Sequence, residues 1–301
     1  MQPIIVIGVS DVESSTTVSI CKAFAKLGYP IVPINYRTII WRFGMPYFER
    51  LVLDTVKKYN PYMMFCCKIN GVNPQLLKDC SELTKVIYWL MDPPETGKQC
   101  GAISLAKASH FSFCSGGGAV QWMIDEGVEN CHLVFDGCDT DIFKPVPAVS
   151  NYMADISFIG AKNQERDLFL QALANNGFHT KAYGSGYSKS VINKEFAQVC
   201  NSSKMMLSMN TYNHPDYFSN RLLRYMGCGS CVLHYDPTET LQKYFKHMKE
   251  VVLFKDKEDL VEKAKSLTDE QIGNIGLGGR DRTIKHYTWS HTTNHILQRI
   301  K

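Results

Sequence analysis

Basic and polar side chains at the expected starts of two helices are suited to hold an anion. Asn220 and Arg221 open an amphipathic segment that ends in Gly227-Cys-Gly229, and Arg166 stands in the first turn of an earlier helical segment, just after Lys162. Helix N-termini favour negative charge, and a guanidinium adds charge-assisted hydrogen bonds. These positions predict an anion site, although an ordinary α/β turn with a solvated arginine, and a solvated loop lysine at Lys162, remain alternatives.

A carboxylate at the end of an apolar strand is a second candidate for chemistry. Asp92 follows the run Val86–Met91 and precedes two prolines that stiffen the turn. There it can orient a hydroxyl-rich substrate or act as a general base, or it simply caps the next helix or turn. Ser10 and Asp11 after the first strand, and Lys68 after the third, are further candidates with weaker support.

Glycines and tyrosines at strand ends and in one loop complete the set of candidates. Gly160 closes the strand that precedes Lys162, and Tyr183-Gly184 closes the following strand, where glycine lets the backbone approach a flat base. Tyr212 lies in the loop before Asn220. Plain turns and a packed loop tyrosine are the alternatives to ligand contacts here.

Alternating apolar runs and amphipathic stretches predict the elements that position these residues. Expected strands in the first half are Ile4–Val9, Ile31–Ile34, Tyr62–Cys67, Val86–Met91, His110–Cys114 and His132–Phe135, with helices over Thr16–Leu27, Pro46–Lys58, Pro74–Leu83, Ile103–Ala108 and Ala119–Glu126.

A second alternating set follows a proline-rich linker at Pro145–Asn151. Expected strands are Ile156–Gly160, Phe178–Tyr183, Lys204–Met209, Cys231–His234 and Val251–Phe254, with helices beginning near Asn163, Asn193, Ser219, Thr238 and Lys257 and a last helix over Thr288–Lys301. This order predicts two doubly wound parallel sheets, in domains 1–147 and 148–301, with a cleft between the carboxyl ends of the sheets.

Composition excludes several classes of protein. With 45% hydrophobic residues among 301, the chain can build two cores, and a net charge of +4 without a long basic run neither requires nor excludes a nucleic-acid partner. No apolar run reaches membrane-span length and the N-terminus reads as a strand, so a cytoplasmic protein without a transmembrane segment is expected. The eleven cysteines suggest a reducing compartment. Cys228-Gly-Ser-Cys231 closes a helix rather than opening one, which argues against redox chemistry, and no second pair makes a zinc site.

Four passages in order resemble the GT-B glycosyltransferases of group 1, and among them the CgeB-like group. Gly137-Cys-Asp-Thr-Asp-Ile-Phe-Lys-Pro145 is similar to G-x-D-x-x-x-F-x-P, and Ile156–Gly160 with Arg166 resembles the start of the donor domain. Asn220-Arg221 with Gly227-Cys-Gly229 is similar to N-R-x-x-E-x-x-x-C-G, and Val251–Phe254, Asp259-Leu260 and His286–Trp289 resemble the closing pattern. Arg224 stands where the family has a glutamate for the donor ribose, so either Glu239 takes that contact or Arg224 faces phosphate.

The resemblance implies a GT-B fold of two Rossmann-like domains and transfer of a sugar from a nucleotide-sugar co-substrate, with retention and without a metal cofactor. It assigns the donor to Gly160, Lys162, Arg166, Tyr183, Gly184, Tyr212, Asn220, Arg221 and Arg224, and sugar or acceptor contact to Asp92. The acceptor stays open among a glycan, a protein, a lipid head group and a modified DNA base. A GT-B-like sugar-nucleotide isomerase or phosphorylase and a non-catalytic nucleotide-sugar-binding protein are the alternative functions.

Overall fold

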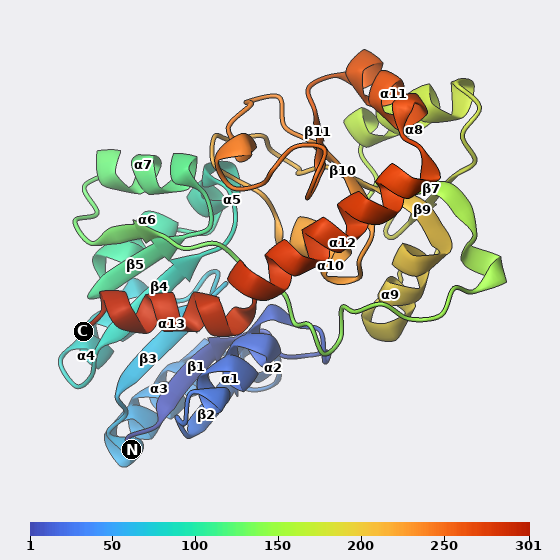
Figure 1. Ribbon diagram of the computed structural model, residues 1–301. Helices are drawn as coiled ribbons and strands as arrows, with labels where there is room; N and C mark the ends of the chain where they lie inside the picture. The colour runs from blue at the N-terminus through green and yellow to red at the C-terminus, as the bar shows by residue number, and fades with distance from the viewer. The chain divides into compact units, whose positions relative to one another are not determined.

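The computed structural model describes all residues from Met1 to Lys301, and its internal contacts divide the chain into two units (Figure 1). The first unit comprises Met1–Asp136 together with Trp289–Lys301, and the second comprises Gly137–Thr288. Each unit holds one parallel sheet covered by helices, which is the predicted α/β class. None of the helices combines the length and hydropathy that crossing a bilayer requires.

The first unit is built on a six-stranded sheet in the order β2-β1-β3-β4-β5-β6, with every registered pair parallel. Its strands are β1 (Ile4–Gly8), β2 (Ile31–Asn35), β3 (Met63–Cys67), β4 (Val86–Leu90), β5 (Phe111–Cys114) and β6 (Cys131–Leu133). The central strands β1, β3 and β4 are buried along their whole length. Continuous apolar runs are the pattern that a parallel sheet covered on both faces requires.

Helices cover both faces of this sheet. They are α1 (Thr16–Lys26), α2 (Tyr36–Phe43), α3 (Met45–Tyr59), α4 (Pro74–Ser81), α5 (Pro94–Gln99), α6 (Ala102–Lys107), α7 (Gly117–Asp125) and α13 (Trp289–Arg299). Apolar residues of α3, α4, α6 and α7 share one buried cluster with the sheet, and those of α1 and α13 share the other. The Trp289 ring packs edge-on against Trp89 of β4, with centroids 6.1 Å apart, which fixes the C-terminal helix to the first sheet.

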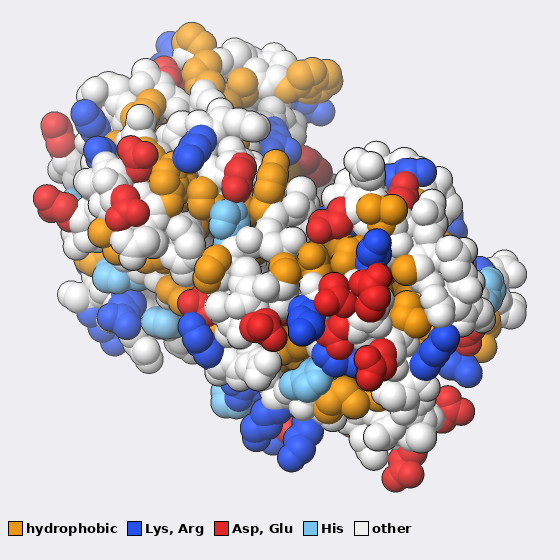
Figure 2. Space-filling model, turned by 90° about the horizontal axis from the view of Figure 1, so that it is seen from above, with side chains coloured by type: hydrophobic (Ala, Val, Ile, Leu, Met, Phe, Trp, Pro, Cys, Tyr) orange, Lys and Arg blue, Asp and Glu red, His pale blue; other side chains and the backbone are white.

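The second unit has a five-stranded parallel sheet in the order β11-β10-β9-β7-β8. Its elements are the 3-10 turn η1 (Ser150–Tyr152), β7 (Ala154–Ile159), α8 (Gln164–Asn175), β8 (Thr180–Tyr183), α9 (Asn193–Ser202), β9 (Ser203–Ser208), α10 (Asn220–Gly227), β10 (Cys231–Tyr235), the 3-10 turn η2 (Leu241–Lys243), β11 (Val252–Phe254), α11 (Lys257–Ser266) and α12 (Asp269–His286). Basic and acidic side chains are interspersed over the face of the molecule in Figure 2, in keeping with the small net charge.

The division into units differs from the expected ranges 1–147 and 148–301 at two places. Gly137–Pro145 packs in the second unit, because Cys138 N donates to the Tyr287 carbonyl at 2.7 Å and Phe143 lies beneath the Arg224 guanidinium. The terminal helix α13, expected with the second domain, packs in the first unit because its apolar face completes the core that α1 leaves open.

Three helices and one turn differ from the periodicity-based prediction. The helices α2, α5 and α12 were not expected, and the helix expected near Thr238 is only the short turn η2. The sequence of α12 does not indicate a helix because it contains four glycines, and glycine disfavours a helix interior. Three of them are needed for close packing: a Cβ at Gly276 would overlap the Gly229 carbonyl oxygen, one at Gly278 that of Lys249, and one at Gly279 that of Glu250.

Candidate active site

The order of strands in the second sheet places the candidate donor residues at one crevice. The chain runs from β7 to β8 in one direction and then from β9 to β11 in the other, so the strand order reverses between β7 and β9. Ligands of open α/β sheets bind outside the carboxyl ends of the strands at such a reversal. The residues that leave these two ends are 160–163 and 209–219, which include Gly160, Lys162 and Tyr212.

Two guanidinium groups meet at this crevice around one aromatic ring. The guanidinium carbons of Arg166 and Arg221 each lie 5.3 Å from the ring centroid of Phe158 on β7. Arg221 Nη1 donates to the Met209 carbonyl oxygen at 2.6 Å, and Arg166 Nη2 approaches the same oxygen at 3.4 Å. Neither group forms an ion pair with a carboxylate, so two positive charges stand together without a counter-charge from the protein.

Arg166 is buried, which its position at a helix start did not predict. Its side chain is 3% exposed, and Nη1 donates to the Ala161 carbonyl at 2.7 Å while Nη2 donates to Thr211 Oγ1 at 3.1 Å. Burial, reinforced by the charge of Arg221, lowers the pKa of Arg166 to about 10. Since Ala161 follows β7 and Thr211 follows β9, this arginine joins the two loops that border the crevice.

Glycines bring the ends of β7 and β8 close together beside the arginine pair. Gly184 has a φ of +120°, and a Cβ there would overlap the Gly160 carbonyl oxygen. A Cβ at Gly160 would lie 2.9 Å from Arg221 Nη2 and 2.8 Å from Phe158 Cζ. The structure thus brings Gly160, Gly184, Arg166 and Arg221 together. Tyr183 is buried and packs edge-on against Tyr152 instead of facing the crevice.

The remaining donor candidates occupy the rim of the crevice. Lys162 is exposed, forms a 3.3 Å ion pair with Asp167 and lies over the Tyr187 ring. Tyr212 is exposed in the loop before α10. Asn220 begins α10 after the N-cap Ser219, as predicted.

Arg224 lies one turn beyond Arg221 on α10. Its guanidinium carbon is 4.7 Å from the Phe143 ring centroid. Phe143 belongs to the passage Gly137–Pro145 that was expected to close the first domain. The contact therefore ties that passage to the helix that carries the candidate phosphate-binding residues.

His234 on β10 is a site residue that the sequence reasoning missed. It is fully buried, its Nδ1 lies 2.9 Å from Ser208 Oγ, and its Nε2 has no partner. Burial, together with the charge of Arg221, lowers the pKa of His234 to about 3, so the ring is neutral. The available signal was a histidine inside the apolar strand Cys231–Tyr235, because a buried strand seldom carries a titratable side chain.

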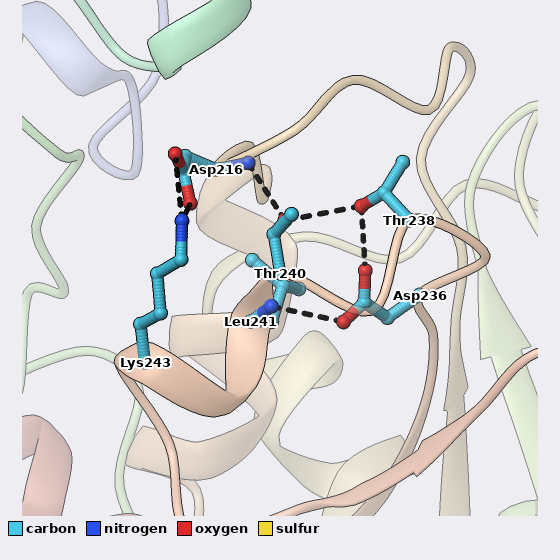
Figure 3. A network of polar contacts seen from close by, with 6 residues as sticks. All are labelled: Asp216, Asp236, Thr238, Thr240, Leu241 and Lys243. Carbon is cyan, nitrogen blue, oxygen red and sulfur yellow. Dashed lines mark hydrogen bonds and ion pairs between the residues drawn. The ribbon is translucent and has the colours of Figure 1, made fainter.

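A polar network after β10 holds the loop that precedes α10 (Figure 3). Buried Asp236 accepts from Thr238 Oγ1 and from the Leu241 backbone N–H, both at 2.9 Å. Thr240 Oγ1 accepts from the Asp216 N–H at 2.8 Å, and Lys243 pairs with the Asp216 carboxylate at 3.1 Å. The network fixes Asp216 and with it the loop that carries Tyr212.

In the first unit, Asp92 pairs with Lys68 across the ends of β4 and β3. Lys68 Nζ lies 3.4 Å from Asp92 Oδ1, and both side chains are partly exposed. Lys68 has a φ of +53°, and its carbonyl accepts from Tyr36 Oη at 2.9 Å. Pro93, not Asp92, is the N-cap of α5. The alternative that Asp92 caps the next helix is therefore wrong.

Ser10 and Asp11 follow β1 on the neighbouring strand. The chain order of this sheet reverses between β1 and β3, so the two residues and Lys68 leave the strands at that reversal. Asp11 Oδ1 accepts from Asn35 Nδ2 at 2.7 Å, and Ser10 is half-buried. Asp11 is thus engaged in holding the end of β2, while Lys68 and Asp92 form the charged pair of this edge.

The cysteines, and the two aspartates of Asp139-Thr-Asp141, lie in surroundings that suit structural roles. All eleven cysteines are free, and Cys228 and Cys231 are buried around the turn between α10 and β10. Asp139 Oδ1 accepts from the Asp141 N–H at 3.2 Å, and the Asp139 carbonyl accepts from the Phe143 N–H. No group of three or more His, Cys, Asp or Glu side chains has the geometry to hold a metal ion.

Comparisons with known proteins bear on the family and the fold of the chain. Residues 165–298 match the family described as glycosyl transferase-like. No curated protein matches the sequence. Among solved structures, HepE from Anabaena in complex with UDP and glucose is similar over 100% of this chain and 99% of its own at 12% identity, with a TM-score of 0.71.

Two further structures have the same fold over nearly the whole chain. Sucrose-phosphate synthase from Thermosynechococcus elongatus covers 99% of this chain and 98% of its own at 12% identity, with a TM-score of 0.72. An alpha-glucosyltransferase in complex with UDP and a 13-mer DNA containing a HMU base covers 99% of each chain at 11% identity, with a TM-score of 0.74. None of these matches distinguishes the CgeB-like group, which stays a prediction.

Proposed function

We propose that this chain, a glycosyltransferase of the GT-B fold, moves a sugar from a nucleoside diphosphate sugar to an acceptor with retained anomeric configuration and without a metal ion. The observation that carries the donor assignment is the pair Arg166 and Arg221, two guanidinium groups without a carboxylate partner at the strand-order reversal of the second sheet. A bound diphosphate would supply the missing negative charge.

The two arginines have different parts in this proposal. Arg221 is only partly buried and stands at the N-terminal end of α10, so its free N–H groups contact the diphosphate directly, aided by the helix dipole. Arg166 is buried and donates hydrogen bonds to two backbone carbonyls. It acts as a positioning residue that holds the loops after β7 and β9 and adds positive potential. His234, whose pKa is lowered by burial and by the charge of Arg221, stays neutral and does not compete for the anion.

The reaction breaks the bond between the anomeric carbon and the diphosphate oxygen and forms a bond from that carbon to an acceptor oxygen, whose proton passes to the departing diphosphate oxygen. The leaving nucleoside diphosphate carries at least two negative charges. Fixed cationic donors at the place where this charge develops lower the barrier without rearrangement during the reaction. Arg221 and the start of α10 provide such donors from the protein alone, and Arg166 adds positive potential.

The first unit contributes Asp92 in this proposal. Its carboxylate, held by Lys68 at 3.4 Å, accepts a hydrogen bond from a hydroxyl of the transferred sugar or of the acceptor. The paired lysine also holds the Asp92 carboxylate in place. A hydrogen-bonding role needs only this orientation, whereas a general base must give up the pairing when it takes a proton.

Uridine diphosphate sugars are the first donors to test, because HepE and the alpha-glucosyltransferase were solved with UDP. A thermal-shift panel of nucleotide sugars identifies the donor, since a ligand at 100 times its Kd adds about 2.7 kcal/mol to the unfolding free energy. Hydrolysis of that donor without acceptor should then release free sugar slowly. Tight binding without any release, even at high enzyme concentration, would favour the non-catalytic binding protein instead.

A further inference from the structure

The corner between α2 and α3 in the first unit exposes a group of aromatic side chains. Trp41 is 82% exposed, Phe43 is 60% exposed and Tyr47 is 42% exposed. The Phe43 and Tyr47 rings pack against each other with centroids 4.9 Å apart. A contiguous group of exposed aromatic side chains is unfavourable in water and is typical of a surface that binds a protein, a ligand or a membrane.

Basic side chains extend from this aromatic corner along the outer face of α3. Arg42 lies between Trp41 and Phe43, and Arg50, Lys57 and Lys58 are exposed on α3. Residues spaced by three, four or seven positions share a helix face, so Tyr47, Arg50, Asp54 and Lys57 form one row. None of the four basic groups forms an ion pair. At 1.5 Å per residue, this row is roughly 15 Å long.

The whole segment carries a net positive charge. Residues 36–59 hold five basic and two acidic side chains, although the chain as a whole is nearly balanced. We refer to Trp41, Arg42, Phe43, Tyr47, Arg50, Lys57 and Lys58 as the α2–α3 surface. Its partner must combine negative charge with an apolar region that can accept whole aromatic side chains.

We propose that the α2–α3 surface docks the protein on an anionic phospholipid surface, with Trp41 and Phe43 inserted at the interface and the basic row lying over the headgroups. Aromatic side chains favour the headgroup boundary, and basic groups near an anionic membrane add electrostatic attraction. Ile39, Ile40 and Met45, half-buried between the corner and the core, make the surroundings of the aromatic residues apolar.

An extended nucleic acid fits the surface less well. Base stacking uses the flat face of a ring that protein packing holds in place, with polar groups at its edge to meet the backbone. Trp41 instead projects almost entirely free of the protein, and aliphatic side chains surround the corner. These features suit insertion into a lipid interface.

The site of the surface also suits an enzyme that works at an interface. Helix α2 begins at Tyr36, directly after β2, and Tyr36 Oη donates to the carbonyl of Lys68. The surface therefore starts at the same sheet edge as Lys68 and Asp92. Docking does not depend on the donor or on turnover, so it can be tested whether or not sugar transfer is found.

The experiment is co-sedimentation of the full chain with vesicles of phosphatidylcholine alone or with an equal amount of phosphatidylglycerol. We expect pelleting only with the anionic vesicles. Trp41→Ser/Phe43→Ser should weaken it at least tenfold, while Leu277→Ser, at a 68% exposed position on α12, should not change it. Arg50→Gln/Lys57→Gln should weaken it about 30-fold, from about 1 kcal/mol for each basic group, whereas Lys285→Gln should have little effect.

Tryptophan emission supplies a second measurement in the unaltered chain. Trp89 and Trp289 are buried and Trp122 is half-buried, so Trp41 should give the blue shift on vesicle addition. Trp41→Phe should lose the shift and keep most of the binding. Absence of wild-type binding to anionic vesicles, or binding that survives Trp41→Ser/Phe43→Ser, would overturn the proposal. Binding of a labelled single-stranded oligonucleotide or self-association that needs Trp41, with no vesicle binding, would assign the surface to those partners instead.

Discussion

Arg166 and Arg221 both approach the Met209 carbonyl oxygen and the Phe158 ring. They come from helices α8 and α10, and the strands β8 and β9 lie between these helices along the chain. The charge of Arg166 costs free energy in the empty protein, because burial and repulsion from Arg221 both oppose its ionisation. Proteins keep such a cost where a ligand offsets it. The pair is therefore the feature from which the donor-binding predictions follow.

Removing Arg221 should weaken donor binding without unfolding the protein. Charge-assisted hydrogen bonds contribute about 1.5–3 kcal/mol, so Arg221→Ala should raise the donor Kd by roughly 10- to 150-fold. Arg221→Lys should recover part of the loss, because it keeps the charge but not the planar donors. Titration calorimetry against the control Lys285→Ala measures this effect. An unchanged Kd for Arg221→Ala would show that the diphosphate does not bind in this crevice.

An added methyl group at Gly160 tests the position of Arg221 without changing any charge. The Cβ of Gly160→Ala would lie 2.9 Å from Arg221 Nη2 and 2.8 Å from Phe158 Cζ, so the guanidinium or the ring must move. We expect a Kd at least tenfold higher, equivalent to about 1.4 kcal/mol, and an unfolding free energy lower by about 1–3 kcal/mol.

Gly273→Ala is the matched control, because a Cβ at Gly273 on α12 meets no atom within 4 Å. Alanine is the better helix former, so this control should be neutral or slightly stabilising. Equal donor affinity for the Gly160→Ala and Gly273→Ala variants would show that Gly160 does not lie at the anion site.

The sequence predicted the elements of the second sheet because each strand is a short apolar run and each turn carries its own local signal. The start of α10 at Asn220 is an example, since Ser219 precedes it and Leu222, Leu223 and Met226 form its buried face. Local signals do not show which side chains converge from distant segments. The enclosure of Arg166 depends on Thr211 and Met209, which lie more than 40 residues away.

The candidate site of the first unit shows the same limit. Asp92 at a strand end is readable from the run before it, but its partner Lys68 lies on another strand and was predicted only as a separate candidate. The left-handed backbone at Lys68 could not be expected, because lysine has no preference for positive φ. The buried His234 was hidden by the apolar residues around it. Contacts across the sheet, rather than composition, decide all three positions.

Turnover should survive chelation. The Asp139 carboxylate accepts the Asp141 N–H, which is a turn contact rather than an open ligand set. Dialysis against EDTA should therefore leave the initial rate unchanged. Loss of activity that manganese restores would contradict this and make Asp139 and Asp141 candidate ligands.

The buried His234 should make the protein sensitive to acid. Its folded-state pKa of about 3 lies below the ordinary 6.5, so the unfolded chain takes up a proton that the folded chain excludes. The contribution of His234 to stability is complete above about pH 6.5 and should fall by about 1.4 kcal/mol per pH unit as the pH drops toward about 3. Chemical unfolding of wild type and His234→Leu between pH 7 and 5 should show a flatter slope for the variant. Identical slopes would mean that His234 is protonated in the folded protein.

Replacement of Asp92 separates two mechanisms of sugar transfer. A carboxylate that only orients a hydroxyl keeps its shape in Asp92→Asn, so transition-state binding should fall by about 1–3 kcal/mol. A general base cannot be replaced by an amide, and the loss would then be on the order of 100- to 10,000-fold in kcat with little change in donor affinity. Asp79→Asn, on the exposed face of α4 where Asp79 accepts from Gln75, is the matched control.

We expect the smaller loss, because the ion pair with Lys68 holds the Asp92 carboxylate in an orientation suited to accept a hydrogen bond. Lys68→Met should then release the Asp92 carboxylate from this orientation, so the rate should fall. NMR of the anomeric proton in the product decides the stereochemistry. Retention agrees with an orienting Asp92, whereas inversion together with the larger loss in Asp92→Asn would make this residue the catalytic base and reject the retaining mechanism.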